Sequence, residues 1–255
     1  MDVLGKHLEC AWFGRRRAGV PVLVLLHEGL GSVAMWGDFP QRLGAATDLP
    51  VFAYSRLGYG GSDALADGFG LDYMHREAVD SLPVVLAAQS IARAILVGHS
   101  DGASIALLHA GGGAGQRAAA LVLEAPHVFV EDISIAGIEK AREGYRQGRL
   151  RTALERYHGA NTERVFRAWN DIWLDPAFRA WNIESCLPAI DVPVQVIQGR
   201  DDPYGTLAQV DAVAAGCAGP VEKVILDDCG HAPHRDRGEA VLDAVGRFVR
   251  SLAET

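Results

Sequence analysis

The sequence predicts a doubly wound α/β fold, in which helices cover a mostly parallel β-sheet and one helical insertion interrupts the pattern. Six short apolar runs are each bounded by glycine, proline or charged residues, and longer amphipathic stretches lie between most of them. The apolar runs do not alternate with polar residues, which is typical of strands buried on both faces of a parallel sheet. One long stretch without a clear strand breaks the alternation and indicates an insertion.

The expected elements follow in chain order. The expected strands are 21–29, 49–58, 93–100, 119–127, 192–200 and 222–231. The expected helices are 33–46, 73–90, 102–110, 206–215 and 237–253. Residues 2–14 are expected to add one or two antiparallel strands at the edge of the sheet.

The insertion lies between the fourth and fifth of these strands. Its sequence has helical patterns over 137–159 and 163–174 but no clear strand. An insertion at this point of an α/β sheet usually lies over the carboxyl ends of the strands, where ligands bind. We therefore expect residues 1–128 and 191–255 to form the core, and residues 129–190 to form a helical lid.

Composition and charge exclude several classes of protein. The chain has 255 residues and a formal net charge of −8, so binding to nucleic acid phosphates is not expected. Its one basic cluster, Arg15–Arg17, is interpreted as a solvated hairpin turn. No apolar stretch reaches the roughly 18 residues that a membrane span needs, and no signal peptide is visible. Four scattered cysteines indicate reduced thiols, so a cytoplasmic location is expected.

The stretch GHSDG, at residues 98–102, carries the strongest chemical signal. It joins the expected strand 93–100 to an expected helix. A G-x-S-x-G pattern in this context is typical of a sharp turn that holds the serine hydroxyl at the tip of the sheet. Ser100 is therefore the candidate nucleophile, and the alternative is a serine in a structural turn.

A serine hydroxyl needs a base to become nucleophilic, and the base needs an acid that orients it. Asp201 and Asp202 follow the expected strand 192–200, and His231 ends the last expected strand. Because the carboxyl ends of parallel strands meet at one edge of a sheet, these residues and Ser100 are expected to meet there. The order serine, acid, histidine along the chain is typical of serine-nucleophile enzymes with this fold class.

These motifs resemble the α/β-hydrolase superfamily, and the resemblance covers nearly the whole chain. Besides GHSDG, the segments LLHEGLGS (25–32), SRLGYGGSD (55–63), IQGRDDPYG (198–205) and CGHAPH (229–234) are similar to its landmark segments. The resemblance implies an α/β-hydrolase fold with a triad of Ser100, Asp202 and His231. The family's acid stands three residues after a glycine, which selects Asp202 over Asp201.

The resemblance also implies two backbone N–H groups that would hold the oxyanion of an acyl-transfer intermediate. One belongs to Asp101, and the other belongs to Gly29 in the HEGLGS segment. Glu28 departs from the family, in which many members have glycine at this position. Its carboxylate either braces the loop through a hydrogen bond or brings a charge into the site. His27 is expected to stabilise the same loop.

The Asp101 carboxylate has two interpretations: it complements the dipole of the helix that it begins, or it faces the pocket and prefers a cationic substrate group. The aromatic residues of the insertion also have two: they form its own core, or some of them line an apolar acyl pocket. The candidate pocket residues are Glu28, Trp36, His127, Trp169, Trp173 and Trp181.

The expected activity is hydrolysis of a small carboxylic ester, thioester or lactone through an acyl-enzyme on Ser100. The alternatives are C–C bond hydrolysis of a vinylogous diketone, a non-hydrolytic use of the same triad, and a hydrolase-like receptor that only binds its ligand. The triad needs no metal or organic cofactor, and His231 and His234 lack a third metal ligand at suitable spacing. The expected partner is a small molecule, and a homodimer remains open.

Overall fold

The centre of the fold is a seven-stranded sheet. The computed structural model describes residues 1–3, 5–64, 69–113 and 117–252. The strand order is β3-β5-β4-β6-β7-β8-β9. β3 runs antiparallel to β5 and the other neighbours are parallel, which confirms the predicted mostly parallel sheet. The strands are β3 Cys10–Phe13, β4 Val22–Leu26, β5 Val51–Tyr54, β6 Ala94–His99, β7 Ala118–Glu124, β8 Val194–Gly199 and β9 Val221–Leu226.

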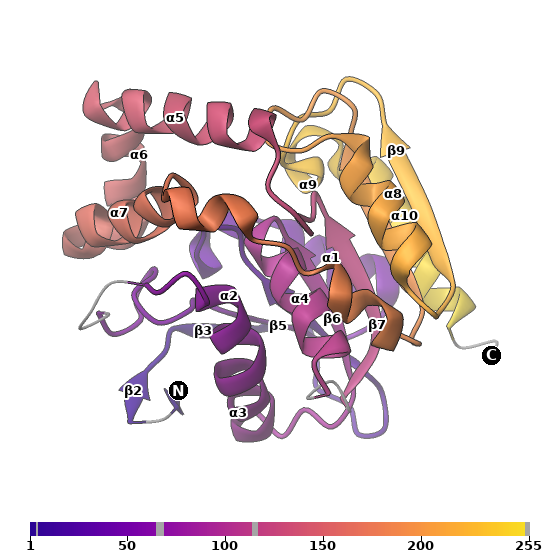
Figure 1. The fold of residues 1–255 in the computed structure, drawn as a ribbon. Coiled ribbons are helices and arrows are strands. Elements are labelled where there is room, and N and C mark those ends of the chain that lie inside the picture. Colours follow the sequence, from indigo (N-terminus) through magenta and orange to yellow (C-terminus); the bar gives the residue numbers. More distant parts are fainter. Residues whose placement is uncertain (4, 65–68, 114–116, 253–255) are drawn as a thin grey trace.

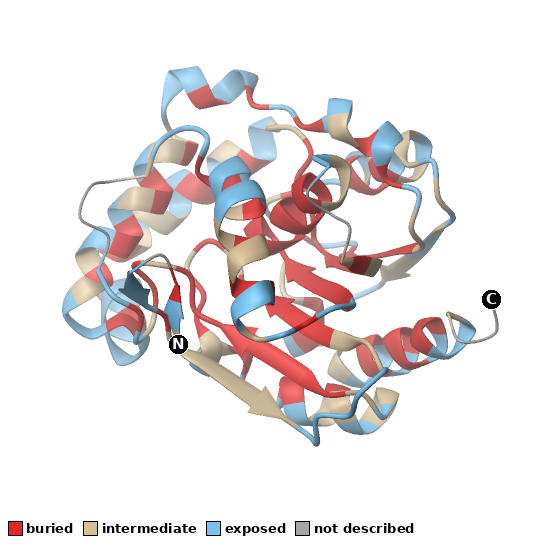
Figure 2. Ribbon diagram, turned by 90° about the horizontal axis from the view of Figure 1, so that it is seen from below, coloured by how far each residue is buried: buried red, intermediate tan, exposed pale blue. Residues whose placement is uncertain are grey.

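Helices cover both faces of this sheet, and Figure 2 shows buried strands between helices whose outer faces are exposed. α1 and α10 pack together on one face, and α3, α4 and α8 pack on the other. The core helices are α1 Phe39–Thr47, α2 Tyr73–Arg76, α3 Leu82–Ala88, α4 Asp101–Gly111, α8 Leu207–Gly216, α9 Pro233–Asp236 and α10 Gly238–Ser251. The expected last position of the final helix, 253, lies outside the described residues.

The strands are apolar on both faces because successive side chains of a strand point to opposite sides of the sheet. In β4, Leu23 and Leu25 join the apolar cluster that α1 and α10 complete. Val24 and Leu26 join the cluster under α3 and α4. All four side chains are buried, so the unbroken apolar run in the sequence corresponds to a strand with helices on both sides.

Two expected helices are interrupted. The first consists of a 3-10 turn, Val33–Trp36, and then α1, with the break at Gly37, whose φ is 59°. The stretch 73–90 contains a π-helical turn, Glu77–Ser81, just before Pro83. Proline lacks an N–H and its ring crowds the preceding turn, and the wider π turn accommodates both effects.

Three helices occupy the predicted insertion between β7 and β8: α5 Asp132–Arg146, α6 Arg149–His158 and α7 Thr162–Trp173. The helical pattern expected over 137–159 is split between α5 and α6, because Gly148 adopts a φ of 90° that ends the helical path. Figure 1 shows these helices together at one end of the molecule. 3-10 turns at Pro176–Ala180 and Glu184–Ala189 lead back to β8.

The amino-terminal region agrees in part with the sequence. β1 Asp2–Val3 and β2 Lys6–His7 pair antiparallel apart from the main sheet, and β3 is the antiparallel edge strand. The interpretation of Arg15–Arg17 as a hairpin turn is wrong, because β5 lies between β3 and β4. All four cysteines are free thiols. Over the described ranges, none of the helices has the length and apolar character that crossing a membrane requires.

Candidate active site

Ser100 lies in the sharp turn between β6 and α4. Its φ of 54° and ψ of −118° form a conformation that residues with a side chain rarely adopt. Glycines make this turn possible: a Cβ on Gly102 would collide with the carbonyl oxygen of Leu26, and a Cβ on Gly98 would collide with the backbone of Gly102. The GHSDG pattern therefore corresponds to a strained turn that presents the Ser100 hydroxyl.

His231 lies between Ser100 and Asp202. Its Nε2 is 2.9 Å from Ser100 Oγ, and its Nδ1 is 2.7 Å from Asp202 Oδ2. A carboxylate only accepts hydrogen bonds, so Nδ1 carries the proton and Nε2 is left to accept one from the serine hydroxyl. The residues come from the ends of β6, β8 and β9, which meet at one edge of the sheet.

Asp202 is held as a carboxylate by several donors. The backbone N–H of Tyr204 donates to its Oδ1 at 2.8 Å, and Gln198 Nε2 donates to its Oδ2 at 2.7 Å. Burial opposes the charged form, but the hydrogen bond and charge of His231 outweigh it, and the pKa of Asp202 is lowered. Asp201 is exposed, and its backbone N–H bonds to Cys229 O.

The carbonyl oxygen of Glu28 accepts three hydrogen bonds at the start of the predicted oxyanion loop. The donors are His27 Nδ1 at 2.7 Å, Arg56 Nη2 at 3.0 Å and the backbone N–H of Gly31 at 3.1 Å. Because the peptide bond is planar and trans, a fixed Glu28 carbonyl also fixes the direction of the Gly29 N–H. His27 thus stabilises this loop, as predicted from the sequence.

The insertion reaches the same loop through Trp169 of α7. A Cβ on Gly29 would collide with Trp169 Nε1 and would lie 3.1 Å from Asp101 Oδ2. Trp169 is only 8% exposed. The indole therefore covers Gly29 directly beside the nucleophile turn.

We expect the Gly29→Ala variant to be destabilised by about 1–3 kcal/mol, because the added methyl group overpacks this contact. A second substitution, Trp169→Ala, makes room for the methyl group, so the double variant is expected to lose less than the sum of the two single losses. Urea unfolding of the four proteins measures this coupling. Strictly additive losses would show that the two residues do not contact each other.

A second link from the insertion to this loop is His158, at the end of α6. Its Nε2 lies 2.9 Å from Leu30 O, and its Nδ1 accepts the Gly60 N–H at 3.0 Å. This pattern requires a neutral ring, and burial lowers the pKa of His158. Sequence reasoning did not single out His158, because its partners lie far away along the chain.

The Asp101 carboxylate is completely buried in the first turn of α4. Its Oδ2 accepts the Tyr73 hydroxyl at 2.6 Å and lies 3.9 Å from Arg56 Nη2. Trp173 Nε1 in turn donates to the Tyr73 hydroxyl at 3.1 Å. Burial raises the pKa of Asp101, and the charge of Arg56 opposes this effect. Arg56 and Tyr73 were not predicted from the sequence, although an arginine two residues after an apolar strand is a usable signal.

The Glu28 side chain turns toward His99, the residue before Ser100. Glu28 Oε2 lies 3.5 Å from His99 Nδ1, and Glu28 Oε1 lies 4.0 Å from Arg235 Nη2. The side chain is 19% exposed. Both contacts tie the predicted oxyanion loop to neighbouring elements through charge, whereas the bracing interpretation expected a hydrogen bond.

Besides Trp169, the predicted pocket aromatics lie in two places. Trp173 packs edge-on against His127, and its ring centroid is 6.3 Å from that of Trp181. His127 lies 5.7 Å from His231 between ring centroids, so this group adjoins the triad. Trp36 instead packs against Phe39 and His234 in the cluster that α1 and α10 complete.

We expect His127 to make the protein sensitive to acid. Burial, followed by the charge of His231, lowers the pKa of His127 to about 3. In the unfolded chain this pKa is about 6.5, so between these values the unfolded state binds more protons. Stability should therefore fall on acidification from pH 6.5 toward 3, by up to roughly 1.4 kcal/mol per pH unit for this proton. Urea unfolding should give a smaller slope for His127→Phe, and equal slopes would contradict the prediction.

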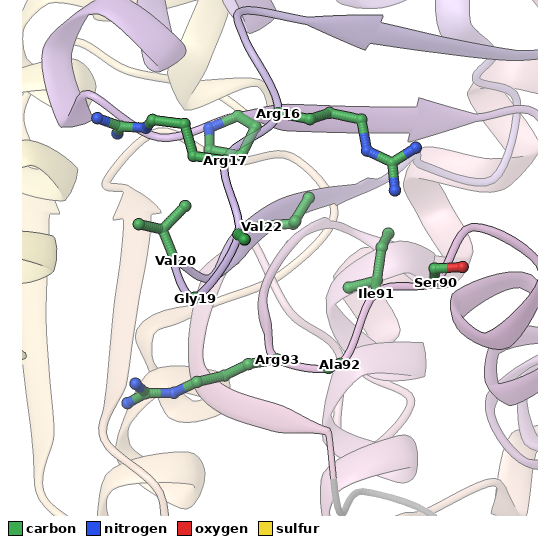
Figure 3. Close-up of a pocket in the computed structure, with 11 residues that line it drawn as sticks. Arg16, Arg17, Gly19, Val20, Val22, Ser90, Ile91, Ala92 and Arg93 are labelled. Atoms are coloured by element: carbon green, nitrogen blue, oxygen red, sulfur yellow. The ribbon is translucent and has the colours of Figure 1, made fainter.

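A separate hollow lies at the opposite, amino-terminal edge of the strands, and Figure 3 shows its lining. It contains Ser90, whose φ of 55° is as unusual as that of Ser100. Arginines 16, 17 and 93 also line it, but among its described lining residues there is no histidine or carboxylate to activate a serine. Arg16 stacks on Trp12. This hollow therefore lacks the groups found around Ser100.

Comparison with known proteins identifies the family of the chain. Residues 23–244 match the model of the alpha/beta hydrolase family. This span is most of the sequence, and the chain belongs to the α/β-hydrolase family. The predicted fold and family are thereby confirmed. A comparison with curated proteins finds no match.

Many solved structures share the fold. An enol-lactonase from Burkholderia xenovorans LB400 is 20% identical, with a TM-score of 0.75 over 97% of this chain and 98% of that chain. An esterase from Exiguobacterium antarcticum, EaEST, is 17% identical, with a TM-score of 0.76 over 98% of each chain. A thermophilic esterase from Thermogutta terrifontis is 19% identical, with a TM-score of 0.70 over 97% of this chain and 94% of that chain.

Proposed function

We propose that this protein is a serine hydrolase that cleaves a small carboxylic ester, thioester or lactone through an acyl-enzyme on Ser100. The observation that carries the proposal is His231, which bonds to Ser100 at 2.9 Å on one side and to Asp202 at 2.7 Å on the other. Esterases and a lactonase among proteins of the same fold support this class of substrate.

In the first half of the reaction, the Ser100 oxygen forms a bond to the acyl carbon while its proton passes to His231 Nε2. Asp202 stabilises the resulting imidazolium, since its pKa is lowered and it stays ionised. His231 then gives the proton to the leaving oxygen or sulfur. In the second half, water forms a bond to the acyl carbon while its proton passes to His231. His231 then gives this proton to Ser100 Oγ as the bond between Oγ and the acyl carbon breaks, which releases the carboxylic acid.

The oxyanion is assigned to the backbone N–H groups of Gly29 and Asp101. Asp101 is the first residue of α4, so its N–H has no partner within the helix and lies at the positive end of the helix dipole. The triply bonded Glu28 carbonyl fixes the peptide that carries the Gly29 N–H. Fixed donors of this kind stabilise developing charge without reorganisation.

The insertion, residues 129–190, is proposed to act as a lid over this site. Trp169 covers Gly29, and Ser100 is only 7% exposed. Buried aromatic rings beside His231 favour a small, largely apolar acyl group over a polymer. The free cysteine thiols support a reducing compartment such as the cytoplasm as the place of action.

Turnover and active-site labelling test the proposal. Wild-type protein is expected to hydrolyse p-nitrophenyl acetate, and a p-nitrophenyl phosphonate is expected to add one phosphonyl group to Ser100, detected by peptide mass spectrometry. Product analysis with a vinylogous diketone separates ester hydrolysis from C–C bond hydrolysis. If the wild type shows no turnover and no labelling, the proposal is overturned. That result would instead support a receptor that only binds its ligand.

A further inference from the structure

His99, the residue before the nucleophile, is buried beside His231. Their ring centroids are 5.2 Å apart, and His99 Nε2 lies 2.6 Å from the backbone carbonyl oxygen of His231. A carbonyl oxygen only accepts hydrogen bonds, so Nε2 of His99 must carry a proton. His99 therefore holds the loop of His231 by its main chain.

The other ring nitrogen of His99 faces an acid. Its Nδ1 lies 3.5 Å from Glu28 Oε2. This nitrogen makes no hydrogen bond to the described residues, and at this distance the Glu28 carboxylate would attract a proton on it. The two contacts together fit a His99 ring that is protonated on both nitrogens.

The charges around this ring favour the same state. Burial opposes a charged His99, but its contact with Glu28 and the charge of Glu124 outweigh burial and raise its pKa. Glu124 itself pairs with His234 at 2.8 Å, and His234 packs edge-on against His99. Arg235 lies on the far side of Glu28.

We propose that Glu28 and His99 are positioning residues, whose partly buried ion pair joins the loop of Gly29 to the loop of His231. This inference rests on the proposed hydrolase function of the site. Glu28 contributes twice, because its carbonyl fixes the Gly29 N–H and its carboxylate fixes His99. The pair thereby sets the distance between the oxyanion donor and the base. Catalytic groups need such support, since a displacement of about 1 Å can cost roughly 100-fold in rate.

The charged state of His99 can be measured without any activity. Protein with ¹⁵N-labelled histidine is recorded by NMR at about pH 8, where a free histidine is neutral. We expect His99, assigned with a His99→Gln variant, to carry protons on both nitrogens, and to carry one in Glu28→Gln. His109 is an internal control: it is buried, bonds one carbonyl at 2.8 Å and has a lowered pKa. One proton on wild-type His99 would overturn the proposal.

Kinetics test the positioning role. His99→Ala is expected to lower kcat for p-nitrophenyl acetate on the order of 10- to 100-fold, with KM changed less than about twofold. His99→Gln places an amide N–H near the position of Nε2 and should recover part of the loss. His109→Gln, which replaces a buried histidine in the last turn of α4, is the matched control and should keep wild-type kcat. Equal kcat in wild type and His99→Ala would overturn the proposal.

These two measurements separate the inference from the function on which it rests. If the wild type has no turnover and no phosphonate label, the hydrolase proposal fails while the NMR experiment still reports the ion pair. If the wild type turns over but His99 carries one proton, the hydrolase proposal stands and the ion pair does not exist.

Discussion

Replacement of Ser100 by alanine is expected to lower kcat/KM for p-nitrophenyl acetate by roughly 10³- to 10⁶-fold. The variant keeps His231, Asp202 and the oxyanion donors, but it has no atom that can form the acyl-enzyme. Residual activity then comes only from a water activated by His231 and from binding. Steady-state kinetics measures this loss, at a protein concentration high enough to detect the residual activity of the variant.

A matched control is Ser90→Ala. Ser90 shares the positive φ of Ser100 but lies at the opposite edge of the strands, in the hollow of Figure 3, so its replacement should leave kcat/KM unchanged. Ser100→Gly should be as inactive as Ser100→Ala yet more stable than the wild type by about 1 kcal/mol, because glycine relieves the strained backbone. Retained turnover in Ser100→Ala would mean that another residue is the nucleophile.

The triad could be predicted because each member lies within a few residues of the carboxyl end of a recognisable strand. Ser100, Asp202 and His231 are far apart in sequence, but parallel strands bring their carboxyl ends to one edge. The order of the strands in the sheet therefore brings three residues that are far apart in sequence together in space. The choice between Asp201 and Asp202 came from the family resemblance, and the structure gives Asp202 the contact with His231.

The supporting contacts could not be predicted in the same way. Tyr73, on α2, reaches Asp101 from outside the strand ends, and His158 reaches Leu30 across 128 positions of sequence. Such contacts depend on how the insertion and α2 pack, which local patterns do not encode. The packing of Trp36 could not be predicted either. The 3-10 turn that contains Trp36 places its ring against Phe39, and its role in the pocket stays a prediction.

The second large effect is expected at the buried ion pair of Arg56 and Asp101. Arg56 and Asp101 have side chains that are 5% and 0% exposed, 3.9 Å apart. Arg56 also donates to the Glu28 carbonyl, and Tyr73 donates to Asp101. Breaking a buried pair by removing one partner leaves the other charge uncompensated, which typically costs about 3–5 kcal/mol.

We therefore expect Arg56→Met to lose about 3–5 kcal/mol of unfolding free energy at pH 7 in urea titrations. The charge of Arg56 lowers the pKa of Asp101, which burial raises, so the variant has a still higher folded pKa. A carboxyl group with a raised folded pKa destabilises the fold as pH rises, so the loss should be smaller at pH 5 than at pH 8. Adding Asp101→Asn, which still accepts from Tyr73, should restore much of the stability and remove the pH difference. A loss that is independent of pH and unchanged by Asp101→Asn would show that Arg56 acts through packing rather than through its charge.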